Sequence, residues 1–240
     1  MILRIAIVFA VIGLIYVSGV GVVTPEASVQ EVVASPWVVS KYEPGSPFPL
    51  QAKAGIVLDR ETGEVYYERN SEMVLPIASL TKIMTAMVVL DEGVVDMNLF
   101  KRMLVFSDND AANRLVKGKV LKMNQKAREL GMNDTSFDDA SGLSPLNISS
   151  VLDLVVLTKA SLNYPEIWET LKLPSYLGIE NTNELLGEYG VIAGKTGYTD
   201  EAGESLLLLT DNLITIVLNA KNRFLESQKL IELFNVERSN

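Results

Sequence analysis

The chain has 240 residues, of which 21 are Lys or Arg and 30 are Asp or Glu; its formal charge is -9, and it contains neither histidine nor cysteine. These absences exclude a Ser-His-Asp triad, a thiol protease, a disulfide framework and a zinc site built on histidine or cysteine. The acidic balance argues against a nucleic-acid partner, because phosphate binding needs clustered Lys and Arg.

The N-terminus carries a targeting signal. Residues 5–23 are uncharged and follow Arg4, and this apolar run is long enough to cross a bilayer as a helix. It predicts either a cleaved export signal or a membrane anchor at residues 1–23. We favour the anchor, because the run is longer than the apolar region of most signal peptides. Either alternative places the remainder on the extracytoplasmic face of the membrane.

A linker and one domain are expected after this segment. Residues 24–50 contain five prolines, which disfavour regular structure and predict an extended tether. Residues 51–240 are enough for one folded domain with a substantial core. We find no internal repeat and no low-complexity run in them.

Strand patterns occur at both ends of this domain and helical patterns in its middle. The expected strands are 54–58, 64–67, 190–197, 204–210 and 213–218, and the expected helices are 79–91, 99–106, 111–116, 120–130, 149–163 and 223–234. This order predicts an α+β fold, in which the terminal segments share one antiparallel sheet and the central helices form a mostly helical subdomain. The cleft between them is the natural active site.

A serine and a lysine stand one helical turn apart, at Ser79 and Lys82. The helix expected over 79–91 is apolar nearly all round, so it should be buried, and a buried lysine is rare unless it is paired or functional. Burial lowers the pKa of a lysine, so Lys82 could accept the proton of Ser79 in place of the missing histidine. Taken alone, the pair is also compatible with a helix-capping serine and a lysine that reaches solvent.

Two further motifs follow along the chain. Ser107-Asp108-Asn109 is expected between two helices, and Lys195-Thr196-Gly197 is expected on a strand. S-x-x-K, S-D-N and K-T-G in this order occur in penicillin-binding proteins and class A β-lactamases. Asp108, Asp110, Asp138 and Asp139 lack the spacing of a calcium loop, so we expect solvated acidic loops and no metal site.

With these motifs the chain resembles the D-alanyl-D-alanine carboxypeptidases, the low-molecular-mass penicillin-binding proteins of serine peptidase type S11. The resemblance covers about residues 52 to 236 and includes the segments 75–85, 131–137, 140–144, 181–186 and 194–199. It implies a β-lactamase/transpeptidase-like fold without a cofactor. The implied partners are peptidoglycan stem peptides ending in D-Ala-D-Ala, β-lactam antibiotics as covalent inhibitors, and the membrane through residues 5–23.

The resemblance also implies roles for the motif residues on the helical side. Ser79 would attack the carbonyl carbon between the two D-alanines, and Lys82 would take its proton. Ser107 would pass a proton to the leaving amine. Asn109 would orient Lys82 and the substrate amide.

On the strand side, Lys195 and Thr196 would hold the terminal carboxylate, and Lys195 would lower the pKa of Lys82. Gly197 would leave room for the substrate, and the backbone N–H of Tyr198 would form an oxyanion hole with that of Ser79. Arg223 matches an arginine near the carboxylate pocket, or is a solvated arginine at a helix start.

Two features depart from the resemblance, and two other functions compete with it. Only residues 83 to 106 separate Lys82 from Ser107, where the family has a longer insert, so part of one cleft wall should be missing. The second domain and the C-terminal anchor that are common in the family are also not expected. A class A β-lactamase needs a glutamate to activate the deacylating water, and residues 141–147 contain none. A membrane-tethered protein that binds peptidoglycan termini without cleaving them is the alternative from another functional class.

Overall fold

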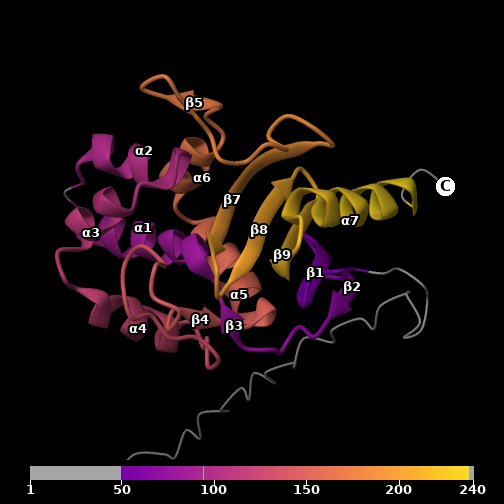
Figure 1. The fold of residues 1–240 in the computed structure, drawn as a ribbon, viewed down its shortest axis with the longest axis horizontal. Helices are drawn as coiled ribbons and strands as arrows, with labels where there is room; N and C mark the ends of the chain where they lie inside the picture. The colour runs from indigo at the N-terminus through magenta and orange to yellow at the C-terminus, as the bar shows by residue number, and fades with distance from the viewer. Residues whose placement is uncertain (1–49, 94, 238–240) are drawn as a thin grey trace, which may run out of the picture. The chain divides into compact units, whose positions relative to one another are not determined.

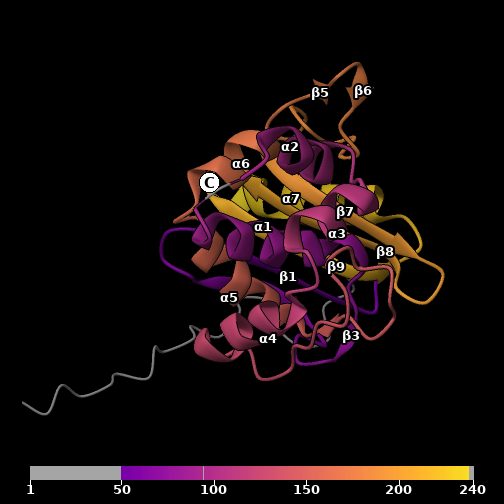
Figure 2. The same ribbon diagram turned by 90° about the vertical axis from the view of Figure 1, so that its left-hand side faces the viewer.

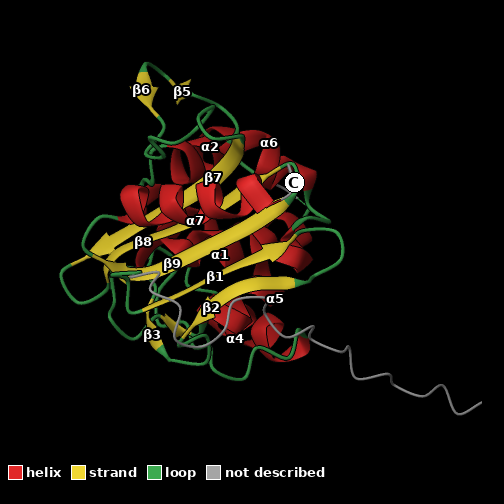
Figure 3. Cartoon of the chain, turned by 90° about the vertical axis from the view of Figure 1, so that its right-hand side faces the viewer, coloured by secondary structure: helices red, strands yellow, loops and turns green. Residues whose placement is uncertain are grey.

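A five-stranded antiparallel sheet forms the frame of the domain, with the strand order β2-β1-β9-β8-β7 (Figure 3). The computed structural model describes residues 50–93 and 95–237, so the predicted anchor and nearly all of the predicted linker lie outside the described residues. The first and last strands of the chain meet where β1 pairs with β9, as the strand patterns predicted. The strands are β1 (Ala54–Asp59), β2 (Val65–Arg69), β7 (Val191–Thr199), β8 (Gly203–Thr210) and β9 (Leu213–Ala220).

Side chains of the central strands point alternately into two hydrophobic cores, one on each face of the sheet. On β8, Leu207 and Leu209 join the core shared with the helical layer, whereas Leu206 and Leu208 join a second core on the opposite face. The second core is covered by α7 (Arg223–Glu237), which lies across the sheet from the other helices (Figure 1). Burial on both faces keeps the sheet rigid, and β7 forms the edge nearest to the site described below.

The helical layer is built around one buried helix, α1 (Thr81–Asp91), which lies at its centre (Figure 2). Helix α1 contacts every other helix of this layer, and its residues 81–89 are all buried, as the apolar pattern predicted. The other helices of the layer are α2 (Met97–Val105), α3 (Asn109–Val116), α4 (Val120–Glu129), α5 (Val151–Ser161) and α6 (Pro165–Leu171). The α+β architecture is therefore confirmed.

Some short elements were not predicted. Helix α6 is one, although Pro165 at its first turn is a standard start signal. The others are two-residue strands, which are too short to show a period: β3 (Leu75–Pro76) with β4 (Ile148–Ser149), and β5 (Ser175–Tyr176) with β6 (Ile179–Glu180). Within the described part of the chain, no helix is both long and apolar enough to span a bilayer.

Candidate active site

Ser79 lies in a tight turn at the start of the central helix. The predicted helix from residue 79 begins instead at Thr81, because Ala78–Leu80 form a 3-10 turn, here called the nucleophile turn. Ala78 has φ of +46°, a left-handed conformation that costs energy in a residue with a Cβ. Lys82 Nζ lies 2.7 Å from Ser79 Oγ, so the predicted pair is in direct contact.

Lys82 is fully buried and has two further partners. Its Nζ donates to Asn109 Oδ1 at 2.7 Å and to the Ser141 carbonyl oxygen at 2.6 Å. A neutral amine has two hydrogens and one lone pair. The two hydrogens can serve Asn109 and Ser141, which leaves the lone pair directed at the hydroxyl hydrogen of Ser79.

Burial is the main reason that this amine can be neutral. It lowers the pKa of Lys82 to about 7, although the negative charges of Asp139 and Asp108 oppose the shift. We expected burial and a second cation, Lys195, both to lower the pKa of Lys82, and burial is the main cause. Desolvation dominates at Lys82, and the positive charge of Lys82 instead helps to lower the pKa of Lys195.

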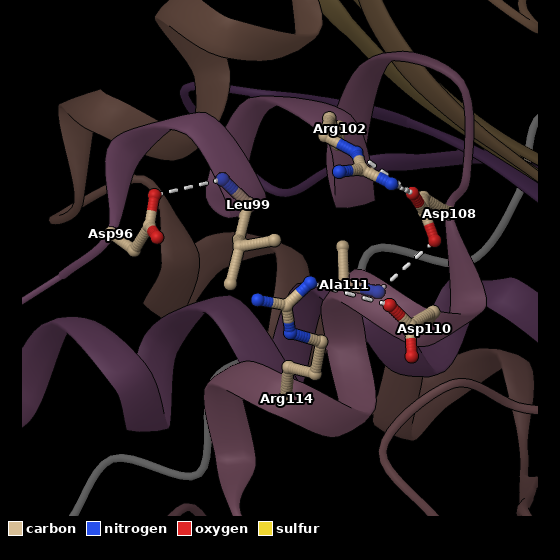
Figure 4. Close-up of polar contacts among 7 residues, drawn as sticks. All are labelled: Asp96, Leu99, Arg102, Asp108, Asp110, Ala111 and Arg114. Atoms are coloured by element: carbon tan, nitrogen blue, oxygen red, sulfur yellow. Dashed lines mark hydrogen bonds and ion pairs between the residues drawn. The ribbon is translucent and has the colours of Figure 1, made fainter.

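The second motif occupies the connection between α2 and α3, and Asp108 holds it in place. Arg102 Nε donates to Asp108 Oδ2 at 2.9 Å, while Asp108 Oδ1 accepts the N–H of Ala111 and caps α3 (Figure 4). Asp96 caps α2 in the same way, through the N–H groups of Asn98 and Leu99. These contacts bring Ser107 to Lys195 and Asn109 to Lys82 despite the short connection from α1.

The third motif joins the sheet edge to the helical layer through Lys195. The Lys195 side chain is 1% exposed, and its Nζ donates to Ser107 Oγ at 3.0 Å and to the Thr196 carbonyl oxygen at 2.9 Å. Burial, followed by the charges of Lys82 and Arg223, holds the pKa of Lys195 well below its usual value. An anion bound here would favour the protonated form of Lys195.

Gly197 allows β7 to approach the nucleophile turn. A Cβ at residue 197 would stand 3.0 Å from the Ile77 carbonyl oxygen and 3.2 Å from the Ser79 nitrogen. The Tyr198 side chain is exposed, and its hydroxyl donates to Asp200 at 2.8 Å. A side chain at residue 197 would therefore push β7 and the nucleophile turn apart by a few tenths of an ångström, so glycine favours their close approach.

Arg223, the first residue of α7, contacts the third motif. Its Nη1 donates to the Gly197 carbonyl oxygen at 3.1 Å, and burial lowers the pKa of its guanidinium although Glu204 and Glu184 oppose the shift. Arg223 is thus partly buried against β7, and it is not the solvated helix-start arginine of the alternative prediction. The three motifs and Arg223 all meet at one end of β7.

The loop from Asp139 to Asn147 is the part of the site that the sequence analysis did not assign. The Asp139 carboxylate accepts the N–H groups of Ser141, Gly142 and Ser144, each at 2.6 Å, and this fixes the Ser141 carbonyl that holds Lys82. We expected all four aspartates to be solvated. Asp110 and Asp138 are exposed, but Asp139 and Asp108 are partly buried and hydrogen-bonded to the protein. Aspartate followed by small residues and glycine is a turn signal that could have identified this loop.

Gly142 packs this loop against the nucleophile turn. It has φ of +85°, and a Cβ there would stand 1.9 Å from the Ala78 carbonyl oxygen. Among the described residues, no group of three or more acidic side chains could hold a metal ion. The arrangement provides a serine, a base with a pKa near neutrality and a buried lysine that can bind an anion, and these groups suit acyl transfer.

Known proteins with this arrangement are peptidases and penicillin-binding proteins. The family model for D-alanyl-D-alanine carboxypeptidases, peptidase family S11, matches residues 40–99 and 92–222. The two matched segments overlap within the short connection between Lys82 and Ser107. A D-alanyl-D-alanine endopeptidase of Pseudomonas aeruginosa is 36% identical over 219 residues, which cover 70% of this chain and 71% of the relative.

Other relatives carry the carboxypeptidase name. D-alanyl-D-alanine carboxypeptidase DacB2 of Mycobacterium tuberculosis is 30% identical, over 71% of this chain and 75% of its own. The structure of penicillin-binding protein D2 from Listeria monocytogenes with bound ampicillin aligns with a TM-score of 0.72 and 33% identity, over 77% of this chain and 98% of that one. The fold is that of penicillin-binding proteins and transpeptidases, and the chain belongs to the D-alanyl-D-alanine carboxypeptidase family of serine peptidases.

Proposed function

We propose that the chain is a serine-type D-alanyl-D-alanine carboxypeptidase that removes the terminal D-alanine from peptidoglycan stem peptides. The observation that carries this proposal is the buried Lys82 amine, 2.7 Å from Ser79 Oγ and with a pKa of about 7. A base with a pKa near the working pH is best suited to transfer a proton.

In the acylation step, Ser79 Oγ forms a bond to the carbonyl carbon of the penultimate D-alanine while its proton passes to Lys82. Collapse of the tetrahedral intermediate breaks the carbon–nitrogen bond, and the proton held by Lys82 passes through the Ser107 hydroxyl to the departing amine of the last D-alanine, which leaves Lys82 neutral again. Asn109 holds Lys82 and the substrate amide. Water then hydrolyses the ester on Ser79, which releases the shortened peptide and restores the hydroxyl.

Substrate orientation depends on the sheet edge. Lys195 and the hydroxyl of Thr196 bind the terminal carboxylate, and Arg223 adds positive charge behind Gly197. The backbone N–H groups of Ser79 and Tyr198 stabilise the oxyanion, a contribution of about 2.7 to 4 kcal/mol for each donor in comparable sites. Gly197 supports this geometry, since a Cβ at this position would stand 3.2 Å from the Ser79 nitrogen and crowd the nucleophile turn.

The leaving amine could also belong to a neighbouring stem peptide, which would make the protein an endopeptidase that cuts cross-links. This second candidate is favoured by the relatives from Pseudomonas aeruginosa, Haemophilus influenzae and Escherichia coli that are named D-alanyl-D-alanine endopeptidases, with 33–36% identity. The chemistry at Ser79 is the same in both reactions. They differ only in the size of the leaving group.

A β-lactamase is disfavoured by the chemistry of the Asp139 loop. Residues 141–147 contain no glutamate. Burial alone would raise the pKa of Asp139, but the N–H groups of Ser144, Gly142 and Ser141 together hold it below its usual value, so this carboxylate is a poor base. β-Lactams should therefore acylate Ser79 and leave slowly.

The family's substrate places the catalytic domain outside the cytoplasm. Residues 5–23 are proposed to anchor it to the extracytoplasmic face of the membrane. The anchor can be tested by fractionation of cells that express the full chain and a variant truncated before residue 51. Loss of the membrane-bound fraction on truncation would support anchoring, and an unchanged distribution would contradict it.

Release of D-alanine tests the proposed activity. The full chain is incubated with a pentapeptide that ends in D-Ala-D-Ala and, separately, with a cross-linked dimer, and the products are separated by chromatography. Native protein should release D-alanine from the first substrate, and Ser79→Ala should release none. Intact substrate that binds equally to native protein and to Ser79→Ala would instead identify a peptidoglycan-binding protein without activity.

A further inference from the structure

Thr182 links the two walls of the proposed carboxylate pocket. Its hydroxyl lies 2.6 Å from that of Thr196 on β7, and its N–H donates to the Val105 carbonyl oxygen at 3.1 Å, close to the second motif. Val105 ends α2, two residues before Ser107. Thr182 therefore touches both the strand and the helical side of the pocket.

The backbone around Thr182 is held by its neighbours and not by its own hydroxyl. Asn181 Nδ2 donates to the carbonyl oxygens of Leu171 and Leu173 at 3.2 and 2.9 Å, and Asn181 Oδ1 accepts the N–H of Asn183 at 2.9 Å. The Thr182 hydroxyl can consequently be removed without removing the contacts that place the residue.

Two hydroxyl oxygens 2.6 Å apart are joined by one hydrogen bond, in which one hydroxyl donates its hydrogen and the other accepts it. Thr196 is 4% exposed, so its hydroxyl has little access to other acceptors. When an anion binds at Thr196, the Thr196 hydrogen points to the anion and the Thr196 oxygen becomes an acceptor. Thr182 is the donor within reach of that oxygen, and donation by Thr182 strengthens the bond from Thr196 to the anion.

We propose that Thr182 is a positioning residue that orients the Thr196 hydroxyl toward the terminal carboxylate of the substrate. This inference rests on the proposed function, in which Thr196 binds that carboxylate. Thr182 acts through Thr196 and does not itself touch the reacting atoms.

Thr182→Val tests the proposal because valine keeps the shape and loses the hydroxyl. For a peptide ending in a D-Ala-D-Ala carboxylate, we expect kcat/KM to fall about tenfold, mostly through KM, because the interaction with the carboxylate exists in both the ground state and the transition state. For the same peptide with a C-terminal amide, native protein and Thr182→Val should differ by less than about twofold. Thr182→Ser should restore the native value.

A double-mutant cycle separates positioning from direct contact. In a Thr196→Val background, Thr182→Val should have no further effect on kcat/KM. Thr135→Val is the matched control, since the Thr135 hydroxyl also lies against another hydroxyl, that of Ser149 at 2.8 Å, and kcat/KM should be unchanged. If Thr182→Val does not fold, Thr182→Ala measured against Thr182→Ser provides the same comparison.

Several results would overturn the inference. An equal loss on the carboxylate and amide substrates would show a structural role, and an added loss in the Thr196→Val background would show direct contact. If Ser79→Ala is inactive, native protein is active and Thr182→Val matches it on the carboxylate substrate, the inference fails while the proposed function stands. If native protein itself does not distinguish carboxylate from amide, the role of Thr196 fails and the inference fails with it.

Discussion

The protonation of Lys82 should control how fast Ser79 is acylated, and this can be followed by changing pH. With a pKa of about 7, roughly half of the Lys82 amines are neutral at pH 7, whereas a lysine with its ordinary pKa of 10.5 would be neutral in only about one molecule in 3,000. Below pH 7 the neutral fraction falls about tenfold for each pH unit. The structure therefore predicts an acylation rate that rises with pH and levels off just above 7.

The assay is acylation by a fluorescent penicillin under pseudo-first-order conditions between pH 5 and 9, with the adduct quantified on denaturing gels. The second-order rate constant should be about tenfold lower at pH 6 than on the plateau. Folding is monitored by circular dichroism at each pH, so that loss of structure is not mistaken for titration. A rate that is flat from pH 5.5 to 8, or that still rises with full slope at pH 9, would refute the role of a neutral Lys82.

Three substitutions extend the account. Asp139→Asn removes a charge that raises the pKa of Lys82, so the acid limb of the acylation profile should move to lower pH while the maximal rate falls roughly tenfold as the loop loosens. Gly142→Ala would place a Cβ 1.9 Å from a carbonyl oxygen of the nucleophile turn at a φ of +85°, so thermal unfolding should show a loss of about 3 kcal/mol and labelling should be lost. Asp108→Ala removes an ion pair and a helix cap and should cost about 1 to 2 kcal/mol of unfolding free energy, whereas Asp110→Ala, which removes an exposed pair at 3.6 Å, should cost little.

Each of these has a contradicting outcome. An acid limb that moves to higher pH in Asp139→Asn would show that its charge does not act on Lys82 as described. Native melting and labelling in Gly142→Ala would mean that the loop can move away from the nucleophile turn at no cost. Equal stability of Asp108→Ala and Asp110→Ala would remove the reason given for the position of the second motif.

The sheet and the long helices could be predicted because their residues form short apolar runs, which are typical of elements buried on both faces. The strand pattern at 204–210 alternates between the two cores, and the helix after Ser79 is buried on every side. The start of α1 was placed two residues early, because the left-handed conformation of Ala78 leaves no mark in the composition. The two-residue strands were missed because two residues show no period, and helix α6 was missed although Pro165 marks its start.

The motifs predicted the site residues, but not how the protein supports them. The chain order of Ser79, Ser107 and Lys195 indicated their shared site, and the structure brings them together. The Ser141 carbonyl and the Thr182 hydroxyl were not predicted, because a backbone oxygen has no residue signature and a threonine pair across distant segments shows only in three dimensions. Burial was predicted as one cause of the low pKa of Lys82, because the helix after Ser79 is apolar nearly all round, and it is the main cause in the structure.

The short connection between Lys82 and Ser107 does not displace the second motif. Capping by Asp96 and the Arg102–Asp108 ion pair hold α2 and the start of α3, and Asn109 reaches Lys82 at 2.7 Å. We therefore expect the short connection to affect substrate choice and not the chemistry at Ser79. The ratio of carboxypeptidase to endopeptidase rates measures that effect.

Covalent labelling by penicillin tests the central claim most directly. Native protein and Ser79→Ala are incubated with a penicillin, and their intact masses are followed for several hours. The account predicts one penicilloyl adduct on native protein that persists over this period, localised to Ser79 by peptide mapping, and no adduct on Ser79→Ala. Rapid turnover of penicillin, or an equal adduct on Ser79→Ala, would contradict it.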